Sequence, residues 1–334
     1  METISKIEKL FTIFNESAEI LSKELEDPYI EGLAETGENF FHQAILQEGL
    51  SELSKKKLDQ LYRSANLSLY TKEEIRKAFQ LAILKGLKEG AHPNHQMTPD
   101  TVGIFMGYLV NKFFSDWEGR FVLLDLACGT GNLLTAVLNS LEMEEADSYG
   151  IDVDELLIRL AYSNANLQEH PVSFFNQDSL QPLFTEPADA VICDLPVGYY
   201  PDDAGAEGYE LKADKGHSYA HHLLIEQGVK YAKPGAYLFF VVPNQLFESE
   251  EAPKLNKFLK EKAFIQGLLQ LPLTMFKSEQ HAKSILILQK KGDRAAMPKN
   301  ALLANLPKFS NKAGMQSVMN QLEDWFKENK QNQV

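Results

Sequence analysis

Apolar residues recur every three or four positions through much of the first ninety residues, the spacing that places them on one face of a helix. They are Ile4, Ile7, Leu10, Phe11 and Phe14 in a first stretch, and Ile75, Phe79, Ala82, Ile83 and Leu87 in a second. Thr71 and Glu74 have the spacing of a capping box, which predicts where the second helix begins. Pro93 cannot continue a helix, so residues 1–92 are predicted to form a helical domain.

Beyond Pro93, short apolar runs alternate with amphipathic stretches. The predicted strands are Phe121–Leu126, Ser148–Ile151, Val172–Phe175, Ala190–Cys193, Tyr237–Val242, Phe264–Leu271 and Ser284–Gln289. The predicted helices between them are Asn132–Leu141, Asp154–Leu167, Tyr219–Lys230 and Ala252–Lys262. This alternation predicts an α/β domain over residues 93–291, built on a mostly parallel sheet covered on both faces. The connection Pro272–Lys283 is too short for a full crossover helix, so the last strand is predicted to be antiparallel.

The remaining residues, 292–334, form a polar tail in which Val318, Leu322, Trp325 and Phe326 predict one amphipathic helix. The chain has 334 residues, of which 44% are hydrophobic and 24% charged, as is typical of a globular protein with a buried core. Two cysteines exclude a disulfide-stapled secreted scaffold. No apolar run reaches the roughly 18 residues of a membrane helix, and Met1–Leu10 does not resemble a signal peptide. A cytoplasmic protein that contacts no membrane is expected.

Negative charge is concentrated in the middle of the chain. The net charge is −4 over residues 1–92, −12 over 93–291 and +2 over 292–334. Five acidic residues stand between positions 202 and 214 with Lys212 as the only cation: Asp202, Asp203, Glu207, Glu210 and Asp214. Because nucleic acids favour basic surfaces, the isolated chain is expected to bind duplex DNA only weakly.

A glycine-rich turn follows the first predicted strand. Residues 125–134 read Asp-Leu-Ala-Cys-Gly-Thr-Gly-Asn-Leu-Leu, so the strand ends in Asp125 and the turn opens a helix. A dinucleotide-binding turn would favour a small residue at position 134, but this chain has Leu134. The chain also lacks the P-loop that would bind a triphosphate. Asp152 ends the second predicted strand, where a carboxylate suits the two hydroxyls of a ribose. The pattern favours a nucleoside ligand without a pyrophosphate.

This turn resembles the first motif of the class I S-adenosylmethionine-dependent methyltransferases. The resemblance implies a Rossmann-like sheet and S-adenosyl-L-methionine as cofactor, with backbone around Ala127, Gly129 and Gly131 near its methionine part. It implies that Asp152 holds the ribose and that Asp178 accepts from the adenine amino group. The other cofactor-binding residues that it implies are Thr98, Pro99, Asp125, Asn132, Leu133, Val153 and Ser179. Cys128 and Cys193 are expected to be small buried residues, and no metal is assigned.

The fourth predicted strand leads into a second motif. Residues 191–201 read Val-Ile-Cys-Asp-Leu-Pro-Val-Gly-Tyr-Tyr-Pro, which places Asp194 at the strand's end. The motif resembles that of amino-methylating enzymes, and in particular the adenine-N6 enzymes related to type I restriction modification subunits. Residues 96–99, 233–244 and 271–288 support the resemblance, which covers roughly residues 93–291. It implies that the Asp194 side chain and the Leu195 carbonyl accept hydrogen bonds from the substrate amine, while Pro196 keeps the turn rigid.

The chain departs from that family at the position whose aromatic side chain stacks on a flipped-out base. The family's aromatic residue falls on Val197, so Tyr199 or Tyr200 is expected to substitute, or the substrate is not a flipped DNA base. His221 and His222 are expected to be surface or packing residues rather than ligands.

The favoured function is methylation of an amino group, with adenine N6 in DNA as the default substrate. The alternatives are a methyltransferase-fold binding protein without turnover, and methylation of another amine in a protein or small molecule. The helical segment 1–92 is expected to present substrate, to dock a protein partner or to form a homodimer.

Overall fold

The computed structural model describes residues 5–90, 97–143, 145–293 and 295–330. Pro93 and Gln96, on which the sequence analysis relied, lie outside the described residues. The helices are α1 (Lys6–Leu25), α2 (Tyr29–His42), α3 (Glu52–Ser64), α4 (Lys72–Glu89), α5 (Asp100–Phe113), α6 (Asn132–Leu138), α7 (Glu155–Leu167), α8 (Ala220–Tyr231), α9 (Ala252–Lys262) and α10 (Lys312–Lys330). The strands are β1 (Phe121–Asp125), β2 (Ala146–Asp152), β3 (Val172–Asn176), β4 (Ala188–Asp194), β5 (Ala232–Pro243), β6 (Ala263–Gln270), β7 (Lys283–Lys290) and β8 (Leu302–Asn305).

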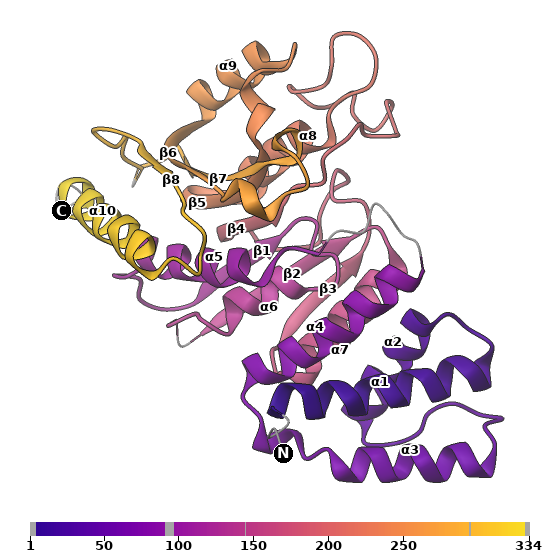
Figure 1. Cartoon of the computed structure of the whole chain (residues 1–334). Coiled ribbons are helices and arrows are strands. Elements are labelled where there is room, and N and C mark those ends of the chain that lie inside the picture. The colour runs from indigo at the N-terminus through magenta and orange to yellow at the C-terminus, as the bar shows by residue number, and fades with distance from the viewer. Residues whose placement is uncertain (1–4, 91–96, 144, 294, 331–334) are drawn as a thin grey trace. The chain divides into compact units, whose positions relative to one another are not determined.

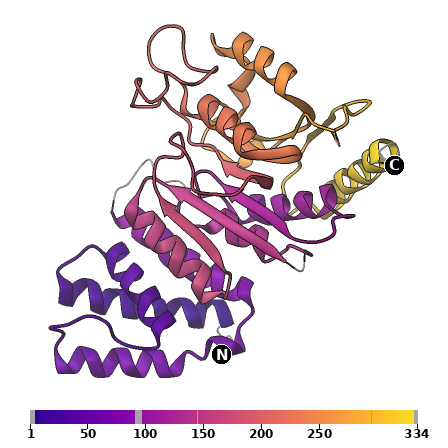
Figure 2. The same ribbon diagram turned by 180° about the vertical axis from the view of Figure 1, so that it is seen from behind.

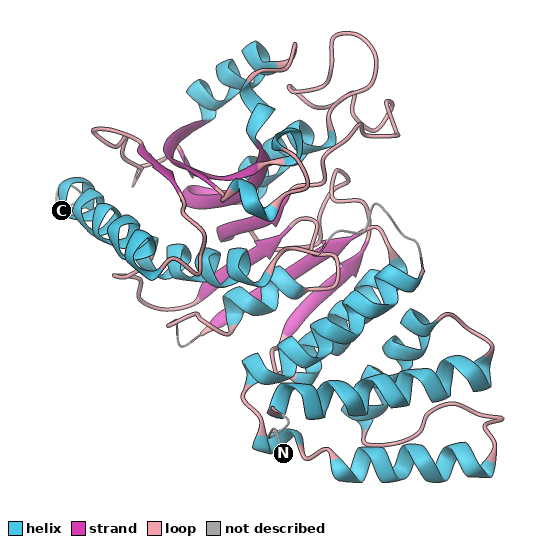
Figure 3. Ribbon diagram, in the orientation of Figure 1, coloured by secondary structure: helices cyan, strands magenta, loops and turns pink. Residues whose placement is uncertain are grey.

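Four α-helices, α1 to α4, lie in the described chain before residue 91, and we call them the N-terminal helices (Figures 1 and 3). The predicted capping box is present, because the Thr71 hydroxyl accepts from the Glu74 N–H and the Glu74 carboxylate accepts from the Thr71 N–H. Apolar side chains of α1, α2 and α4 share one core with Leu157, Leu160 and Leu167 of α7. The N-terminal helices therefore bury their apolar faces partly against a helix of the α/β region.

The strands form one sheet in the order β3-β2-β1-β4-β5-β7-β6-β8. Figure 2 shows the chain from the side opposite to that of Figure 1. β1 runs parallel to β4, and β4 runs parallel to β5. β7 is antiparallel to both β5 and β6, as predicted for the Ser284–Gln289 strand. The mostly parallel α/β sheet with N-terminal helices is therefore confirmed. The sequence analysis missed β8, a four-residue strand in the predicted polar tail that pairs in parallel with β6. The last strand of the chain is therefore β8, which is parallel to its neighbour, and the predicted antiparallel strand β7 comes before it.

The chain divides into two compact units that do not follow its linear order. The first, which we call the glycine-loop unit, comprises 1–115, 128–142 and 150–177. The second, the fourth-strand unit, comprises 116–127, 143–149 and 178–334. One of the points at which the chain passes from one unit to the other lies within the glycine-rich turn, between Ala127 and Cys128. The domain boundaries predicted after residues 92 and 291 stay predictions.

None of the helices in the described part of the chain has the length and hydropathy that a bilayer crossing requires.

Two adjacent histidines on α8 are buried, which agrees with the expected packing role. His221 and His222 pack edge to face, with ring centroids 4.9 Å apart, and both also lie against the ring of Tyr219. Among the described residues, neither His221 Nδ1 nor His222 Nε2 has a hydrogen-bond partner. Burial lowers the pKa of His221 to about 3 and that of His222 to about 4, so both rings are neutral near neutral pH.

We predict that the free energy of unfolding falls as the pH drops from about 6.5 towards 4. The unfolded chain takes up protons at the ordinary histidine pKa near 6.5, whereas the folded chain resists them until the lowered values are reached. His222→Phe removes one such group and should flatten this dependence. Urea unfolding at pH 7.5, 6 and 5 measures it, with exposed His281→Gln as control. The account would be contradicted if the free energy of unfolding depended on pH equally in the wild type and in His222→Phe.

Candidate functional site

In the glycine-loop unit, the predicted loop depends on two glycines with left-handed backbone. Gly129 has φ 53° and Gly131 has φ 71°, values that side-chain-bearing residues adopt only at a cost. A Cβ at Gly131 would lie 3.2 Å from the Cβ of Ala161 on α7, whereas a Cβ at Gly129 would meet nothing within 4 Å. The loop therefore packs closely on α7 at Gly131 and has open space beside Gly129.

Asp152, at the end of β2, is bonded to this loop. Its Oδ2 accepts from the Gly129 N–H at 2.8 Å, and its Oδ1 accepts from the Asp154 N–H at 3.0 Å. The Cys128 N–H also donates to the Ile151 carbonyl at 2.9 Å. The structure thus brings the predicted ribose-binding carboxylate beside the glycine loop. Val153, the next residue, is 68% exposed.

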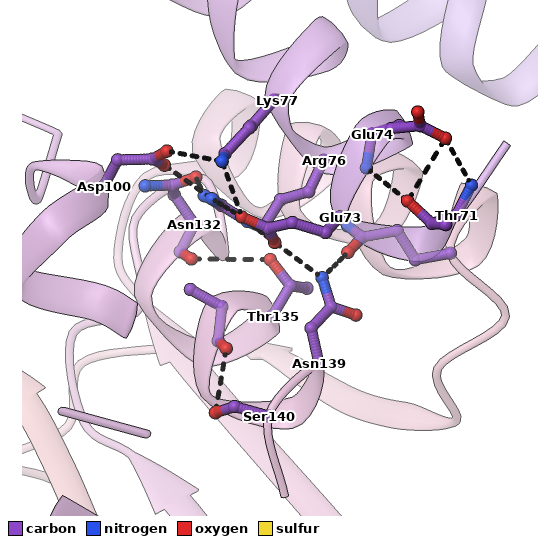
Figure 4. A network of polar contacts seen from close by, with 12 residues as sticks. Thr71, Glu73, Glu74, Arg76, Lys77, Asp100, Asn132, Thr135, Asn139 and Ser140 are labelled. Atoms are coloured by element: carbon purple, nitrogen blue, oxygen red, sulfur yellow. Dashed lines mark hydrogen bonds and ion pairs between the residues drawn. The ribbon is translucent and has the colours of Figure 1, made fainter. Parts of the chain in front are cut away.

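Asn132, the first residue of α6, joins the glycine loop to two other segments. Its Nδ2 donates to the Thr98 carbonyl at 3.0 Å, so the predicted cofactor-binding residues Thr98 and Pro99 lie at the start of this helix. Its Oδ1 accepts from Nη1 of Arg76 on α4 at 2.7 Å (Figure 4). Leu133, also predicted, is buried in α6. Both ends of the Asn132 amide are therefore bonded inside the protein.

Arg76 has no exposed side-chain surface. Its Nε and Nη2 donate to the two carboxylate oxygens of Glu73 at 2.7 Å each, and Nη2 also donates to Asp100 Oδ1 at 2.5 Å (Figure 4). Lys77 Nζ lies 3.4 Å from Glu73 and 3.7 Å from Asp100, so two cations face two anions. Burial opposes the charge of both Arg76 and Glu73, but their mutual attraction outweighs it: the pKa of Glu73 is lowered and the pKa of Arg76 is raised.

In the fourth-strand unit, two predicted aspartates stand at the ends of neighbouring parallel strands. Asp125 ends β1 opposite Ile192 of β4, and Asp194 lies two residues further along β4. Asp125 is fully buried and its Oδ1 accepts from the Ala127 N–H at 3.2 Å. Asp194 Oδ1 accepts from Nζ of Lys283, the first residue of β7, at 2.7 Å. The Asp194 carboxylate is thus held by a cation that the sequence analysis did not single out.

Asp178 and Ser179 are fixed by three other elements of the same unit. The Ser179 hydroxyl donates to the Leu126 carbonyl, and the Tyr200 hydroxyl donates to Asp178 Oδ2. Gln227 on α8 donates to the Ser179 carbonyl at 2.6 Å. Burial, and then the neighbouring Asp178, raise the pKa of Tyr200, so its hydroxyl keeps the proton that it donates. Tyr200 therefore supports the loop that carries Asp178.

Tyr199 is the tyrosine of this motif that presents an aromatic ring to solvent. It is 62% exposed and stacks on Tyr219, with ring centroids 5.1 Å apart and an interplanar angle of 16°. Tyr200 is only 7% exposed, so the suggestion that it substitutes for Val197 as a stacking residue does not fit its position. Leu195 is buried, and its N–H donates to the Val241 carbonyl. Pro196 and Val197 are exposed.

The acidic stretch after Tyr200 is partly neutralised by lysines of its own unit. Three of its carboxylates form ion pairs: Glu207 with Lys212, Glu210 with Lys262 and Asp214 with Lys254. Asp203 lies 3.0 Å from Nδ1 of His217, which carries a charge only when it is protonated. Lys254 and Lys262 come from α9, about forty residues or more along the chain. A linear charge count therefore overstates the negative potential of this stretch.

Sequence reasoning missed Arg76 and Lys283. Arg76 had a visible signal, because it lies three positions before Phe79 and seven before Ile83, within the apolar stripe of α4. A charged residue inside such a stripe needs buried partners. Lys283 gave no comparable signal, since its pairing with Asp194 spans 89 positions.

Comparisons with known proteins find relatives both for the N-terminal helices and for the rest of the chain. Residues 8–87 match the YtxK N-terminal helical domain, and residues 86–333 match the N-6 DNA Methylase family. The chain is 53% identical to the uncharacterised protein YtxK of Bacillus subtilis, over 96% of this chain and 98% of that protein. A solved structure from Listeria monocytogenes, described as a proposed class I S-adenosylmethionine-dependent methyltransferase, is 44% identical. It covers 96% of this chain and 98% of its own, with a TM-score of 0.89.

A more distant structure has the same fold. The methyltransferase subunit of a type I restriction-modification system from Streptococcus thermophilus is 17% identical, with a TM-score of 0.62 over 97% of this chain and 75% of its own. The family that the glycine loop and the fourth-strand motif suggested is thus confirmed: the chain belongs to the N-6 DNA methylase family of class I S-adenosylmethionine-dependent methyltransferases.

Proposed function

We propose that this protein transfers a methyl group from S-adenosylmethionine to an exocyclic amine, with adenine N6 in DNA as the substrate. The observation that carries the proposal is the position of Asp194, which ends a buried strand, is held by Lys283 and precedes Leu195-Pro196. The family match over residues 86–333 supports the same chemistry.

The glycine-loop unit fits the cofactor that the family implies. The open space beside Gly129 admits close approach of a ligand to the backbone, which a side chain there would obstruct. Each carboxylate oxygen has more than one acceptor site, so Asp152 can receive ribose hydroxyls while it keeps its bonds to the backbone. In this proposal Thr98, Pro99, Leu133 and Val153 line the same ligand.

The fourth-strand unit supplies the amine chemistry. The lone pair of the adenine amino group is delocalised into the ring, so the nitrogen is a weak nucleophile until acceptors draw its hydrogens out of the ring plane. We assign these acceptor roles to the Asp194 carboxylate and the Leu195 carbonyl. When bound, S-adenosylmethionine supplies a methyl group whose bond to sulfur breaks as the bond to nitrogen forms. Asp194 is the group that we expect to receive the proton that the nitrogen then loses.

Tyr199 is the residue that we assign to stacking on the substrate base. Its exposed ring already lies on Tyr219, and stacking of a base on an aromatic side chain contributes roughly 1–3 kcal/mol. Val197 offers no aromatic face. We further propose that DNA binding by the chain alone is weak. A basic protein partner docked on the N-terminal helices would then supply the phosphate contacts, since this chain has a net charge of −14.

Transfer of tritium from labelled cofactor to fractionated cell extract tests the proposed substrate. We expect label in DNA, recovered as N6-methyladenine after digestion. Label in RNA, protein or a small amine would keep the methyltransferase activity but replace the substrate. No label in any fraction, despite cofactor binding, would favour a binding protein that has lost turnover.

Asp152→Ala is predicted to weaken S-adenosylhomocysteine binding about tenfold or more. The substitution removes the acceptors for the ribose hydroxyls and also the acceptor for the Gly129 N–H. Isothermal titration calorimetry measures the affinity, and Asp152→Asn, which keeps one acceptor oxygen, should fall in between. A folded Asp152→Ala protein with wild-type affinity would exclude Asp152 from the cofactor site.

Asp194→Ala is predicted to lower turnover on the order of a hundredfold and to leave cofactor affinity within a few-fold, because Asp194 acts on the amine. Lys283→Met should lower turnover about tenfold, and Lys283→Arg should restore part of it. Lys233→Met is the matched control, since Lys233 pairs with Asp189 near the opposite end of β4 at the same 2.7 Å. Equal loss of turnover in Lys283→Met and Lys233→Met would show that Lys283 acts only through stability.

A further inference from the structure

Arg76 links the N-terminal helices to two of the three segments of the glycine-loop unit that carry predicted cofactor residues, those at Thr98 and at Asn132. One guanidinium bonds Glu73 on its own helix, Asp100 at the start of α5 and Asn132 at the start of α6. Asp100 directly follows Thr98 and Pro99, and Asn132 directly follows Gly131. The position of this one side chain therefore constrains both segments.

The amide of Asn132 completes the connection. It accepts from Arg76 at 2.7 Å on one side (Figure 4). On the other side it donates to the Thr98 carbonyl at 3.0 Å. Asn132 is 3% exposed, so solvent cannot readily replace either partner. Loss of the Arg76 donor would leave a buried acceptor next to Gly131.

The far end of α6 is bonded to the same helix of the N-terminal set. Asn139, which caps α6, donates to Glu73 Oε2 at 3.1 Å and to Gln168 at 2.8 Å. Its Oδ1 lies 2.7 Å from Nε2 of His170. The seven-residue helix that follows the glycine loop is thus attached to α4 at both ends, through Arg76 and Glu73.

We propose that Arg76 is a positioning residue for cofactor binding, and that the N-terminal helices therefore belong to the cofactor site rather than serving only to present substrate or a partner. Arg76 acts through Asn132: it fixes the start of α6, and so the conformation of Gly129 to Gly131 and the place of Thr98. This inference rests on the proposed binding of S-adenosylmethionine to the glycine loop.

Calorimetric titration of the full chain with S-adenosylhomocysteine tests the inference. Arg76→Lys keeps the positive charge but cannot bond Glu73, Asp100 and Asn132 together, so affinity should fall about tenfold or more. Asn132→Ala should cause a similar loss. The double variant should bind no more than about threefold more weakly than the weaker single variant, because both substitutions break the same connection.

Arg159→Lys is the matched control. Arg159 on α7 also bonds the N-terminal helices, through Glu31, Glu35 and Glu38 of α2, but it has no bond to the glycine loop among the described residues. It should lower the melting temperature and keep cofactor affinity within twofold. Should Arg76→Lys destabilise the fold too far to titrate, Asn132→Ala and Asp100→Asn, each expected to weaken binding at least fivefold, decide the matter.

Unchanged affinity in a folded Arg76→Lys protein would overturn the positioning role alone, provided that the wild type binds. Losses that multiply in the double variant, or an equal loss in Arg159→Lys, would also overturn it, because Arg76 would then act through general stability. Failure of the wild type to bind S-adenosylhomocysteine would overturn the proposed function, and with it this role.

Discussion

A fully buried guanidinium is the constraint on which the glycine-loop unit depends. Removing one partner of a buried ion pair typically costs about 3–5 kcal/mol, a large part of the stability of a typical domain. The charge of Arg76 is tolerated because Glu73, Asp100 and Asn132 all direct oxygen atoms at it. The three helices α4, α5 and α6 must therefore keep their positions together, or the charge is left uncompensated. Lys77 balances the second carboxylate, so the group as a whole is close to neutral.

This constraint explains how a very short helix can follow a loop whose backbone conformation is unfavourable. Isolated helices of seven residues are unstable in water, and the loop before α6 needs two glycines in the left-handed region. Attachment at Asn132 and Asn139 supplies the missing stability from outside the helix. In the fourth-strand unit, β4 is likewise attached to its neighbours near both ends. Asp189 and Asp194 lie near those ends, and each pairs with a lysine.

The sequence was informative wherever function or fold depends on local patterns. The strands were predicted to within a few residues, except that β5 begins earlier at Ala232, and the glycine loop, Asp152 and Asp194 were recognised from short motifs. What the sequence did not reveal depends on pairs that lie far apart along the chain. Lys283 beside Asp194 and the α9 lysines beside the acidic stretch are examples. The strand β8 was missed because four residues next to a polar helix show too little periodicity.

Hydrogen exchange in the glycine loop tests the central claim most directly, because it reports the loop itself without any ligand. The Gly129 and Gly131 N–H groups are bonded to Asp152 and to the Cys128 carbonyl, so their exchange measures how often the loop opens. The account predicts faster exchange over residues 128–133 in Arg76→Lys and wild-type exchange there in Arg159→Lys. Wild-type exchange over residues 128–133 in folded Arg76→Lys would contradict it, since the loop would then hold its conformation without the buried arginine.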